Sequence, residues 1–153
     1  PSPHPEGDLL KTETKLLPAL HQLSTEYRWN GLLRTPPTPD FFRCALSERM
    51  TVRTALHGPA FLYSGHGSGA KYYSYEQMLA ETEPFSAVSL LMGCSSLRMG
   101  TRGNWTHIGA PLYYVLNRCP MVVGCLWDVS DGDLDRMTKF MLNSVMVGKE
   151  RRT

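Results

Sequence analysis

Residues 59–70 read Pro-Ala-Phe-Leu-Tyr-Ser-Gly-His-Gly-Ser-Gly-Ala, an apolar run that ends abruptly in a glycine-rich turn. The run is long enough for a buried strand, and the turn presents one histidine, His66. Residues 87–96 read Ala-Val-Ser-Leu-Leu-Met-Gly-Cys-Ser-Ser and repeat this plan with Cys94 in place of the histidine. Two neighbouring parallel strands would therefore bring an imidazole and a thiol to the same edge of one sheet.

The rest of the chain alternates between helix-like and strand-like patterns. A third apolar run covers 121–127, and helices are expected over about 17–27, 40–49, 74–81, 110–116 and from the polar turn at 128–133 to about 147. Pro18 is expected in the first turn of its helix, where a missing N–H costs little. The polar, glycine-rich segment 98–107 is expected to be a loop on the active-site side, and Met137, Phe140 and Met141 are expected to face the core. Apolar strands without alternation, separated by helices, predict an α/β fold with a mainly parallel sheet covered on both faces.

Length and composition predict one ordinary globular domain over residues 1–153. The chain is 42% hydrophobic and 20% charged, and its net charge of +2 is too small to indicate nucleic acid or a membrane surface as a partner. It has 4 cysteines without a CxxC pair, a pattern that fits neither a zinc site nor a disulfide framework and favours a reducing, intracellular setting. No apolar run approaches the roughly 20 residues of a membrane span.

Three groups of reactive side chains directly follow the expected strands. They are His66, Cys94 and the pair Asp128 and Asp131. A thiolate nucleophile needs a base beside it, which His66 would supply to Cys94. The backbone N–H groups of Gly67 and Cys94 would stabilise the oxyanion of a tetrahedral intermediate. The pattern predicts a cysteine-protease site without a metal or cofactor.

The remaining candidates have less specific surroundings. Asp128 or Asp131 would hold a basic substrate side chain through a paired carboxylate, or else Ser130, Asp131 and Asp133 cap the last helix; spacing leaves both open. The other cysteines are interpreted as packing residues: Cys44, Cys119 and Cys125. The other histidines do not follow a strand within a glycine-rich turn: His4, His21, His57 and His107. His107 could still face the crevice at the carboxyl ends of the strands.

The turn at 65–70 also fits the pattern G-x-G-x-x-A, a dinucleotide fingerprint when it follows a strand. That interpretation requires a helix immediately afterwards and an acidic residue at the end of the next strand. Here Lys71-Tyr72-Tyr73 follow, and Glu81 and Glu83 precede the next strand rather than end it. A nucleotide-binding α/β domain remains a weaker alternative.

Several motifs together resemble the protease domain of separase, the caspase-like cysteine endopeptidase that opens cohesin at anaphase. They are GHGSGA after FLYS, MGCSS after VSLL, NRCPMVVGCLWDVSDGDLDR and the early Trp29-Asn-Gly, and the resemblance covers nearly the whole chain. It implies a caspase-like α/β/α sandwich with His66 as base, Cys94 as nucleophile, and the amides of Gly67 and Cys94 as the oxyanion hole. It further implies cleavage after arginine, received by Asp131 or, second, by Asp128.

The resemblance also implies partners and a place in the cell. The kleisin subunit of cohesin would be the substrate and securin the inhibitor, with location in cytoplasm and nucleus, at spindle and chromosomes in division. The family has a strand before the segment resembling residues 3–9, and its domain continues beyond Val147, so a partial domain is expected. A caspase-like fragment that is catalytically silent and only binds partners is the second hypothesis.

Overall fold

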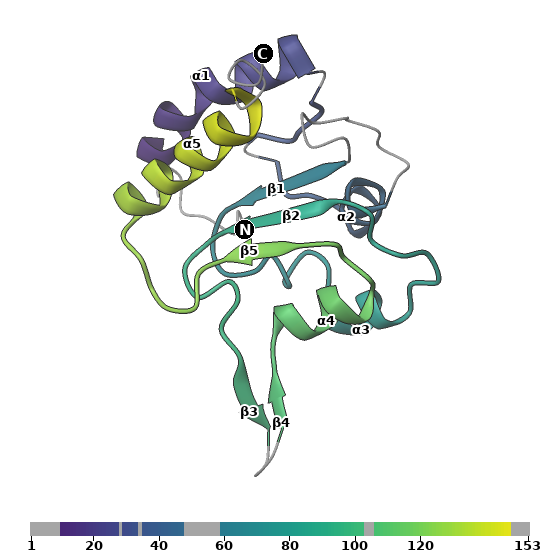
Figure 1. Ribbon diagram of the computed structural model, residues 1–153. Coiled ribbons are helices and arrows are strands. Elements are labelled where there is room, and N and C mark those ends of the chain that lie inside the picture. Colours follow the sequence, from purple (N-terminus) through teal and green to yellow (C-terminus); the bar gives the residue numbers. More distant parts are fainter. Residues whose placement is uncertain (1–9, 28, 34, 48–58, 103–105, 148–153) are drawn as a thin grey trace.

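The computed structural model describes residues 10–27, 29–33, 35–47, 59–102 and 106–147. Its centre is a parallel, three-stranded sheet in the order β1-β2-β5 (Figure 1). The strands are Ala60–Ser64, Val88–Met92 and Val122–Gly124. Tyr63 pairs with Leu91, which in turn pairs with Gly124, so all three strands end at the same edge of the sheet. The parallel arrangement predicted from the three apolar runs is confirmed.

Helices cover both faces of this sheet. α1 (Leu10–Tyr27) and α5 (Asp131–Val147) lie side by side over one face. The other face carries α2 (Pro39–Leu46), α3 (Tyr75–Leu79) and α4 (Ala110–Leu116). The molecule is thus a three-layer α/β/α sandwich, the fold class expected from the sequence.

Successive residues of the central strand β2 face opposite cores, as the strand period of two requires. Leu91 is fully buried among side chains from α2, α3 and α4. Leu90 and Met92 point to the other side, where they pack with residues of α1 and α5. Because both faces of the strand are covered, its apolar sequence shows no alternation.

Local signals place several helix ends where the sequence predicted them. Thr38 caps α2 by accepting a hydrogen bond from the Phe41 amide at 3.2 Å. Ser74 and Gln77 form a reciprocal capping box at the start of α3. Asn117 caps the end of α4. α2 ends at Leu46, three residues before the expected end, and residues 48–49 lie outside the described ranges.

The expected start of the first helix is wrong. α1 begins at Leu10 rather than near residue 17, and Pro18 lies inside it. An internal proline loses a backbone hydrogen bond and costs on the order of 3 kcal/mol. Tertiary packing offsets this cost, because Leu16 and Leu23 are both buried with 3% of their surface exposed.

The expected inner face of the last helix is also partly wrong. Met137 is 39% exposed and Phe140 is 72% exposed, whereas Met141 packs against the core as expected. The buried positions are instead Leu134, Asp135, Thr138 and Leu142. The helix is therefore turned so that a polar pair, Asp135 and Thr138, lies in the buried stripe, which an apolar periodicity alone does not reveal.

Two further segments differ from expectation. Segment 98–107 is not a plain loop, because β3 (Gly100–Arg102) and β4 (Thr106–Ile108) form an antiparallel hairpin that projects from the body of the molecule (Figure 1). β5 is shorter than the apolar run 121–127. After Gly124 the backbone bonds to the turn that follows β2: the Cys125 amide donates to Ser96 Oγ at 3.0 Å.

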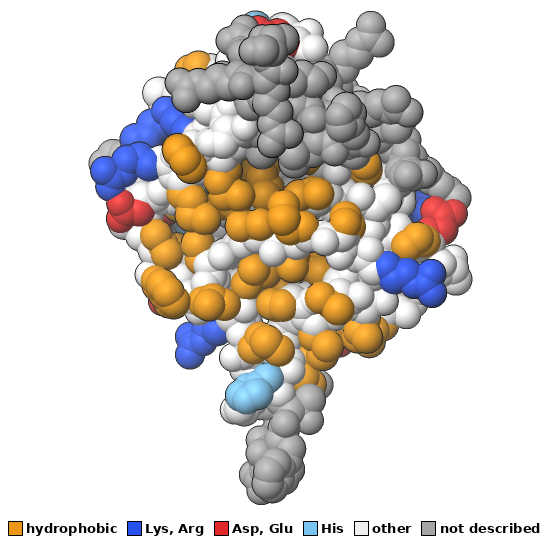
Figure 2. All heavy atoms as spheres, in the orientation of Figure 1, with side chains coloured by type: hydrophobic (Ala, Val, Ile, Leu, Met, Phe, Trp, Pro, Cys, Tyr) orange, Lys and Arg blue, Asp and Glu red, His pale blue; other side chains and the backbone are white. Residues whose placement is uncertain are grey.

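Hydrophobic side chains gather on the face of the molecule that looks onto β5 and α4 (Figure 2). β5 is an edge strand of the described sheet. Several large apolar residues at or near this edge are exposed: Val115, Leu116, Met121, Leu126 and Trp127. Within the described ranges, no helix combines the length and the apolar character that a membrane crossing needs.

Candidate active site

The turn after β1, residues 65–69, will be called the histidine turn. Its start is held to the sheet by the Gly65 amide, which donates to the Met92 carbonyl at 3.2 Å. The Tyr63 hydroxyl donates to the carbonyl of His66 at 2.9 Å, and burial raises the pKa of Tyr63 well above its usual value. Gly67 has a φ of +62°, a left-handed conformation that favours glycine. His66 itself is exposed.

The turn after β2, residues 93–96, will be called the cysteine turn, and it lies directly against the histidine turn. The closest approach is at Gly93. A Cβ on this residue would lie 2.2 Å from the Gly67 carbonyl oxygen and 2.4 Å from that of Gly65. Only glycine fits there, so the residue before Cys94 touches both neighbours of His66. The structure thus brings the two predicted turns together.

Cys94 is half-buried, and its thiol points to the segment that joins β5 to α5. Sγ donates a hydrogen bond to the carbonyl oxygen of Val129 at 2.9 Å. A thiol can donate this bond and a thiolate cannot, so this hydrogen bond belongs to the thiol form of Cys94.

Ser95 makes two more hydrogen bonds to the same segment. Its amide donates to the Trp127 carbonyl at 3.1 Å, and its hydroxyl donates to Asp128 Oδ1 at 2.7 Å. Ser95 has a φ of +52°, which an L residue with a Cβ rarely adopts. We call the three hydrogen bonds from Cys94 and Ser95 to residues 127–129 the cysteine clasp.

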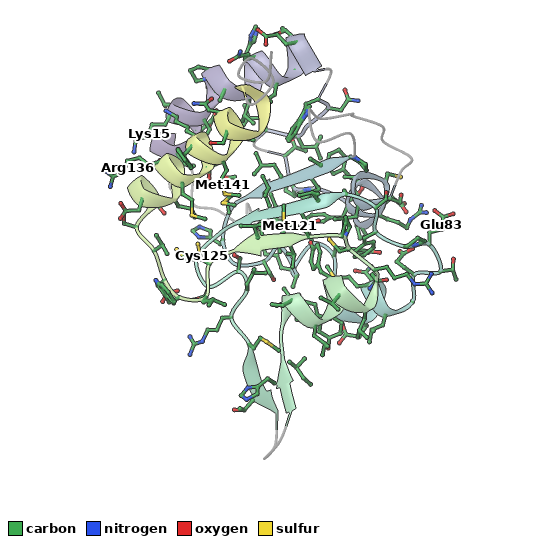
Figure 3. All side chains as sticks on the ribbon, viewed as in Figure 1. Lys15, Glu83, Met121, Cys125, Arg136 and Met141 are labelled. Carbon is green, nitrogen blue, oxygen red and sulfur yellow. The ribbon has the colours of Figure 1, made fainter. Side chains whose placement is uncertain are left out.

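Ser96 ties the cysteine turn to the sheet beneath it. Its hydroxyl is buried, donates to the Leu91 carbonyl at 2.6 Å and accepts from the Cys125 amide. The Leu97 amide then donates to the Cys125 carbonyl at 2.9 Å. These bonds replace the longer β5 strand expected from the sequence, and Figure 3 shows Cys125 at the end of β5.

The two aspartates predicted to receive a basic side chain lie in different settings. Asp128 is exposed and accepts the Ser95 hydroxyl, whereas Asp131 is exposed at the first residue of α5. Ser130 caps the helix through Asp133: the Asp133 amide donates to Ser130 Oγ, and that hydroxyl donates to Asp133 Oδ2. The Ser130 hydroxyl, followed by the Arg136 guanidinium, lowers the pKa of Asp133.

Sequence reasoning did not single out Asp135, the buried carboxylate of this region. It is 2% exposed, and Lys15 Nζ on α1 lies 3.2 Å from its Oδ2 as an ion pair without the alignment of a hydrogen bond. The pair joins α1 to α5. The available signal was its spacing of four residues from Asp131, which places the two on one side of a helix.

The other three cysteines are held away from reactive settings. Burial raises the pKa of the Cys119 thiol, which donates to the Met121 carbonyl at 3.2 Å. Burial also raises the pKa of Cys125, with the charge of an ionised Cys94 as a further cause. Cys44 is half-buried on α2. Their interpretation as packing residues agrees with these positions.

The remaining histidines and the alternative ligand sites receive little support. His21 and His107 are exposed, and His107 lies on the projecting hairpin; His4 and His57 fall outside the described ranges. Among the described residues, no group of three His, Cys, Asp or Glu could hold a metal ion. The helix required by the dinucleotide pattern is also missing at its place, since α3 starts only at Tyr75.

A parallel α/β/α sandwich with a histidine turn against a cysteine turn is a caspase-like protease domain in its architecture. The family model described as "Separin, protease domain" matches residues 4–134, most of the chain. The chain therefore belongs to the separin protease-domain family, as the sequence motifs predicted.

Individual relatives agree with this assignment. The chain is 34% identical to separin of Mus musculus over 139 residues, 36% identical to separin of Schizosaccharomyces pombe over 124, and 32% identical to separin of Saccharomyces cerevisiae over 136. These matches cover 91%, 81% and 89% of the chain but only 6%, 6% and 8% of the relatives.

The fold matches a solved structure as well. A crystal structure of the Saccharomyces cerevisiae separase–securin complex superposes with a TM-score of 0.73 at 30% identity, covering 89% of this chain and 8% of that one. This chain thus corresponds to a small part of a much larger relative.

Proposed function

We propose that this chain carries the catalytic centre of a separase-type cysteine endopeptidase, with Cys94 as nucleophile and His66 as general base. The observation that supports it is the contact of Gly93 with the carbonyls of Gly65 and Gly67. This contact places the thiol-bearing residue and the imidazole-bearing residue on adjoining turns at one sheet edge. A base must lie near its nucleophile to take the proton, and adjoining turns provide that.

The reaction follows from these parts. His66 takes the proton of the Cys94 thiol, and Sγ attacks the scissile carbonyl carbon. The amides of Gly67 and Cys94 stabilise the oxyanion. The tetrahedral intermediate collapses to a thioester, and His66 returns the proton to the leaving amine. Water, deprotonated by His66, then hydrolyses the thioester and regenerates the thiol. A Cβ on Gly67 would meet nothing within 4 Å, so space for a substrate is open beside that amide.

One step precedes the attack. The Cys94 proton is shared with the Val129 carbonyl in the observed geometry, so Sγ has to leave this acceptor before His66 takes the proton. A change of the Cys94 side chain from one staggered rotamer to another, a rotation of about 120° about the Cα–Cβ bond, releases Sγ from this acceptor.

We propose a substrate with arginine before the cleaved bond, and the kleisin subunit of cohesin as that substrate. Asp131 is our first choice to bind the arginine, because it is exposed at the edge of the site and no hydrogen bond ties it to the cysteine turn; Asp128 is second. A guanidinium pairs with a carboxylate through two parallel hydrogen bonds.

Securin, the partner named in the related complex, is the proposed inhibitor. The proposed location is the cytoplasm and nucleus, at the spindle and chromosomes during cell division.

The test is covalent labelling with an acyloxymethyl ketone peptide that ends in arginine. In the complete protein, we expect a single adduct on Cys94, found by peptide mapping. His66→Ala should abolish the adduct, whereas His21→Ala, a change of an exposed histidine on α1, should leave it unchanged. A folded protein that takes no adduct on Cys94 would contradict the proposal.

A catalytically silent, partner-binding domain is the second candidate. The observation in its favour is the hydrogen bond from Cys94 Sγ to the Val129 carbonyl oxygen. The same labelling separates the two: silence would leave Cys94 unlabelled in a folded protein that still binds securin, while an enzyme would be labelled.

A further inference from the structure

The cysteine clasp joins two consecutive residues of the cysteine turn to three consecutive residues after β5. Its members are Ser95 N to Trp127 O, Ser95 Oγ to Asp128 Oδ1 and Cys94 Sγ to Val129 O. The middle bond is the shortest of the three and the one that ends on a charged acceptor. Hydrogen bonds to charged groups are shorter and stronger than neutral ones of the same setting.

The backbone of Ser95 shows why such a clasp is needed. Its φ of +52° lies in the left-handed region, which costs a residue with a Cβ roughly 1–2 kcal/mol. A conformation of this kind persists when its surroundings over-determine it, and such residues gather at functional sites. Ser95 is the next residue after Cys94. Its strained conformation therefore directly sets where the preceding residue places its thiol.

Asp128 is already engaged by this arrangement. Its Oδ1 accepts the Ser95 hydroxyl, and the next residue, Val129, accepts the thiol of Cys94. A substrate guanidinium that paired with both carboxylate oxygens would compete with the Ser95 bond and disturb the clasp. Asp131 carries no such bond to the cysteine turn in the structure.

We propose that Ser95 and Asp128 form a positioning pair that aims the Cys94 thiol, and that Asp128 does not receive the substrate's basic side chain. This inference rests on the proposed function and refines its site. The pair acts through Cys94 and touches no substrate atom. Its loss should therefore slow turnover and leave substrate affinity nearly unchanged.

The decisive comparison is between two replacements of the same residue in the complete protein. Asp128→Asn removes the charge but keeps an oxygen that accepts the Ser95 hydroxyl, and Asp128→Ala removes both. With an arginine peptide substrate, we expect Asp128→Ala to lower kcat about tenfold with KM within about twofold, because it removes a hydrogen bond to a charged group. Asp128→Asn should stay within about threefold of the wild type in kcat, since the weaker bond survives.

An arginine receptor would behave differently. If Asp128 bound the substrate's guanidinium, the charge would matter more than the acceptor, and Asn and Ala would both raise KM to a similar extent. That result would overturn the proposal. Asp131→Asn and Asp131→Ala are the matched controls. At this exposed position, we expect both replacements to raise KM to a similar extent and to leave kcat unchanged.

A second readout does not depend on proteolysis. Breaking the clasp frees the Cys94 proton from the Val129 carbonyl. We therefore expect iodoacetamide to alkylate Cys94 about threefold faster in Ser95→Ala and in Asp128→Ala. The double variant should show no further gain in rate, because both substitutions delete the same hydrogen bond. Additive gains, or no change in either single variant, would contradict the pairing.

Cys125 serves as the internal control for folding, because it is buried beneath the clasp. Its alkylation should stay slow in every variant, and fast labelling of Cys125 would show general loosening of the fold rather than a freed Cys94 thiol.

The kinetic and alkylation readouts also separate the proposed function from the positioning pair. If the wild type cleaves no arginine peptide but Cys94 shows the non-additive gains, the proposed function fails and the positioning pair stands. If the wild type cleaves the arginine peptide but the gains in Cys94 alkylation rate are additive, the proposed function stands and the positioning pair fails.

Discussion

The histidine turn and the cysteine turn lie in contact, yet they are built by different means. The histidine turn uses glycines in the left-handed region, at Gly67 and Gly69, and one hydroxyl from its own strand, that of Tyr63. The cysteine turn places a serine in the left-handed region and holds it with bonds to residues more than thirty positions away. The histidine turn is shaped mainly by its own residues, and the cysteine turn mainly by tertiary contacts.

This difference has a consequence for how each turn responds to change. A turn that glycines shape depends less on distant partners, and its link to β2 is the bond from the Gly65 amide to the Met92 carbonyl. A turn held by distant hydrogen bonds depends on how β5 and α5 sit relative to β2. The position of Cys94 therefore depends more on the rest of the domain than that of His66 does. Each prediction below tests one side of this contrast.

The largest effect is expected where the two turns touch. Gly93→Ala would place a Cβ 2.2 Å from a backbone oxygen of Gly67, which a side-chain rotation cannot relieve. We expect a loss of unfolding free energy of at least about 3 kcal/mol, together with loss of Cys94 labelling, because forced overpacking against backbone displaces both turns. Thermal unfolding of the complete protein measures it. Gly31→Ala is the control, because a Cβ there meets nothing within 4 Å; equal melting of the two variants would refute the contact.

The next effect tests the tertiary side of the contrast. Ser96→Ala removes a buried hydroxyl that bonds both Leu91 and Cys125, leaving the Cys125 amide without this acceptor. We expect destabilisation of about 1–3 kcal/mol in denaturant unfolding. Ser86→Ala is the matched control, because the Ser86 hydroxyl is buried without a hydrogen-bond partner among the described residues. It should be neutral or slightly stabilising, and a loss equal to that of Ser96→Ala would count against the role assigned to Ser96.

A smaller effect is expected for the local side. Tyr63→Phe keeps the ring in the core but deletes the hydrogen bond to the His66 carbonyl. We expect a loss of about 1 kcal/mol of stability. Tyr113→Phe, which retains the ring stacked on Tyr75, is the control and should cost less. A larger cost for Tyr63→Phe than for Ser96→Ala would contradict this ranking, because the exposed end of a local bond would then outweigh a buried tertiary one.

The cysteines should differ in their response to alkaline pH. Burial raises the pKa of Cys119 and Cys125, so the folded state holds those protons longer than the unfolded state does. Their stabilising contribution is full below the ordinary thiol pKa and is lost as pH rises through the folded pKa. At pH 8 we expect iodoacetamide to modify Cys94 before either of them, by mass spectrometry of timed samples. Earlier modification of Cys125 would show that its burial is not maintained.

The smallest effect lies at the start of α5, which follows the clasp. The pKa of Asp133 is lowered, first by the Ser130 hydroxyl and then by Arg136. A lowered pKa contributes stability that is present above the unfolded pKa, near 4 for a free aspartate, and is lost as pH falls through the folded pKa. Asp133→Asn should flatten the acid limb of a melting-temperature profile slightly. An unchanged acid limb would indicate that this exposed cap contributes nothing measurable.

Much of the fold follows from patterns that act over short distances. The runs 59–63 and 87–92 are apolar and β-rich, and they became β1 and β2 with nearly the expected bounds. Thr38 and Ser74 cap their helices because a side-chain oxygen and an amide three residues later need only local geometry. The motifs around His66 and Cys94, together with residues 117–136 and the early Trp29-Asn-Gly, sufficed to assign the family.

Other features depend on partners that a local pattern does not contain. The start of α1 before Pro18 is stabilised by packing against α5, and the rotation of α5 is set by Asp135 and Thr138 within the buried stripe. The end of β5 depends on Ser96, which takes the Cys125 amide out of the strand pairing. Each case involves a bond or contact between residues far apart in the sequence.

The amino-acid sequence by itself determined the two glycine-flanked strand ends, the parallel α/β class and the separin family, because strand, cap and turn preferences are local. Only the tertiary structure decided that Gly93 seats one turn on the other, that the Cys94 thiol rests on Val129, and that Ser95 in its left-handed conformation is held by Asp128. The physical reason is that each of these interactions joins atoms whose distance is fixed by how the layers pack, and packing is a property of the whole domain.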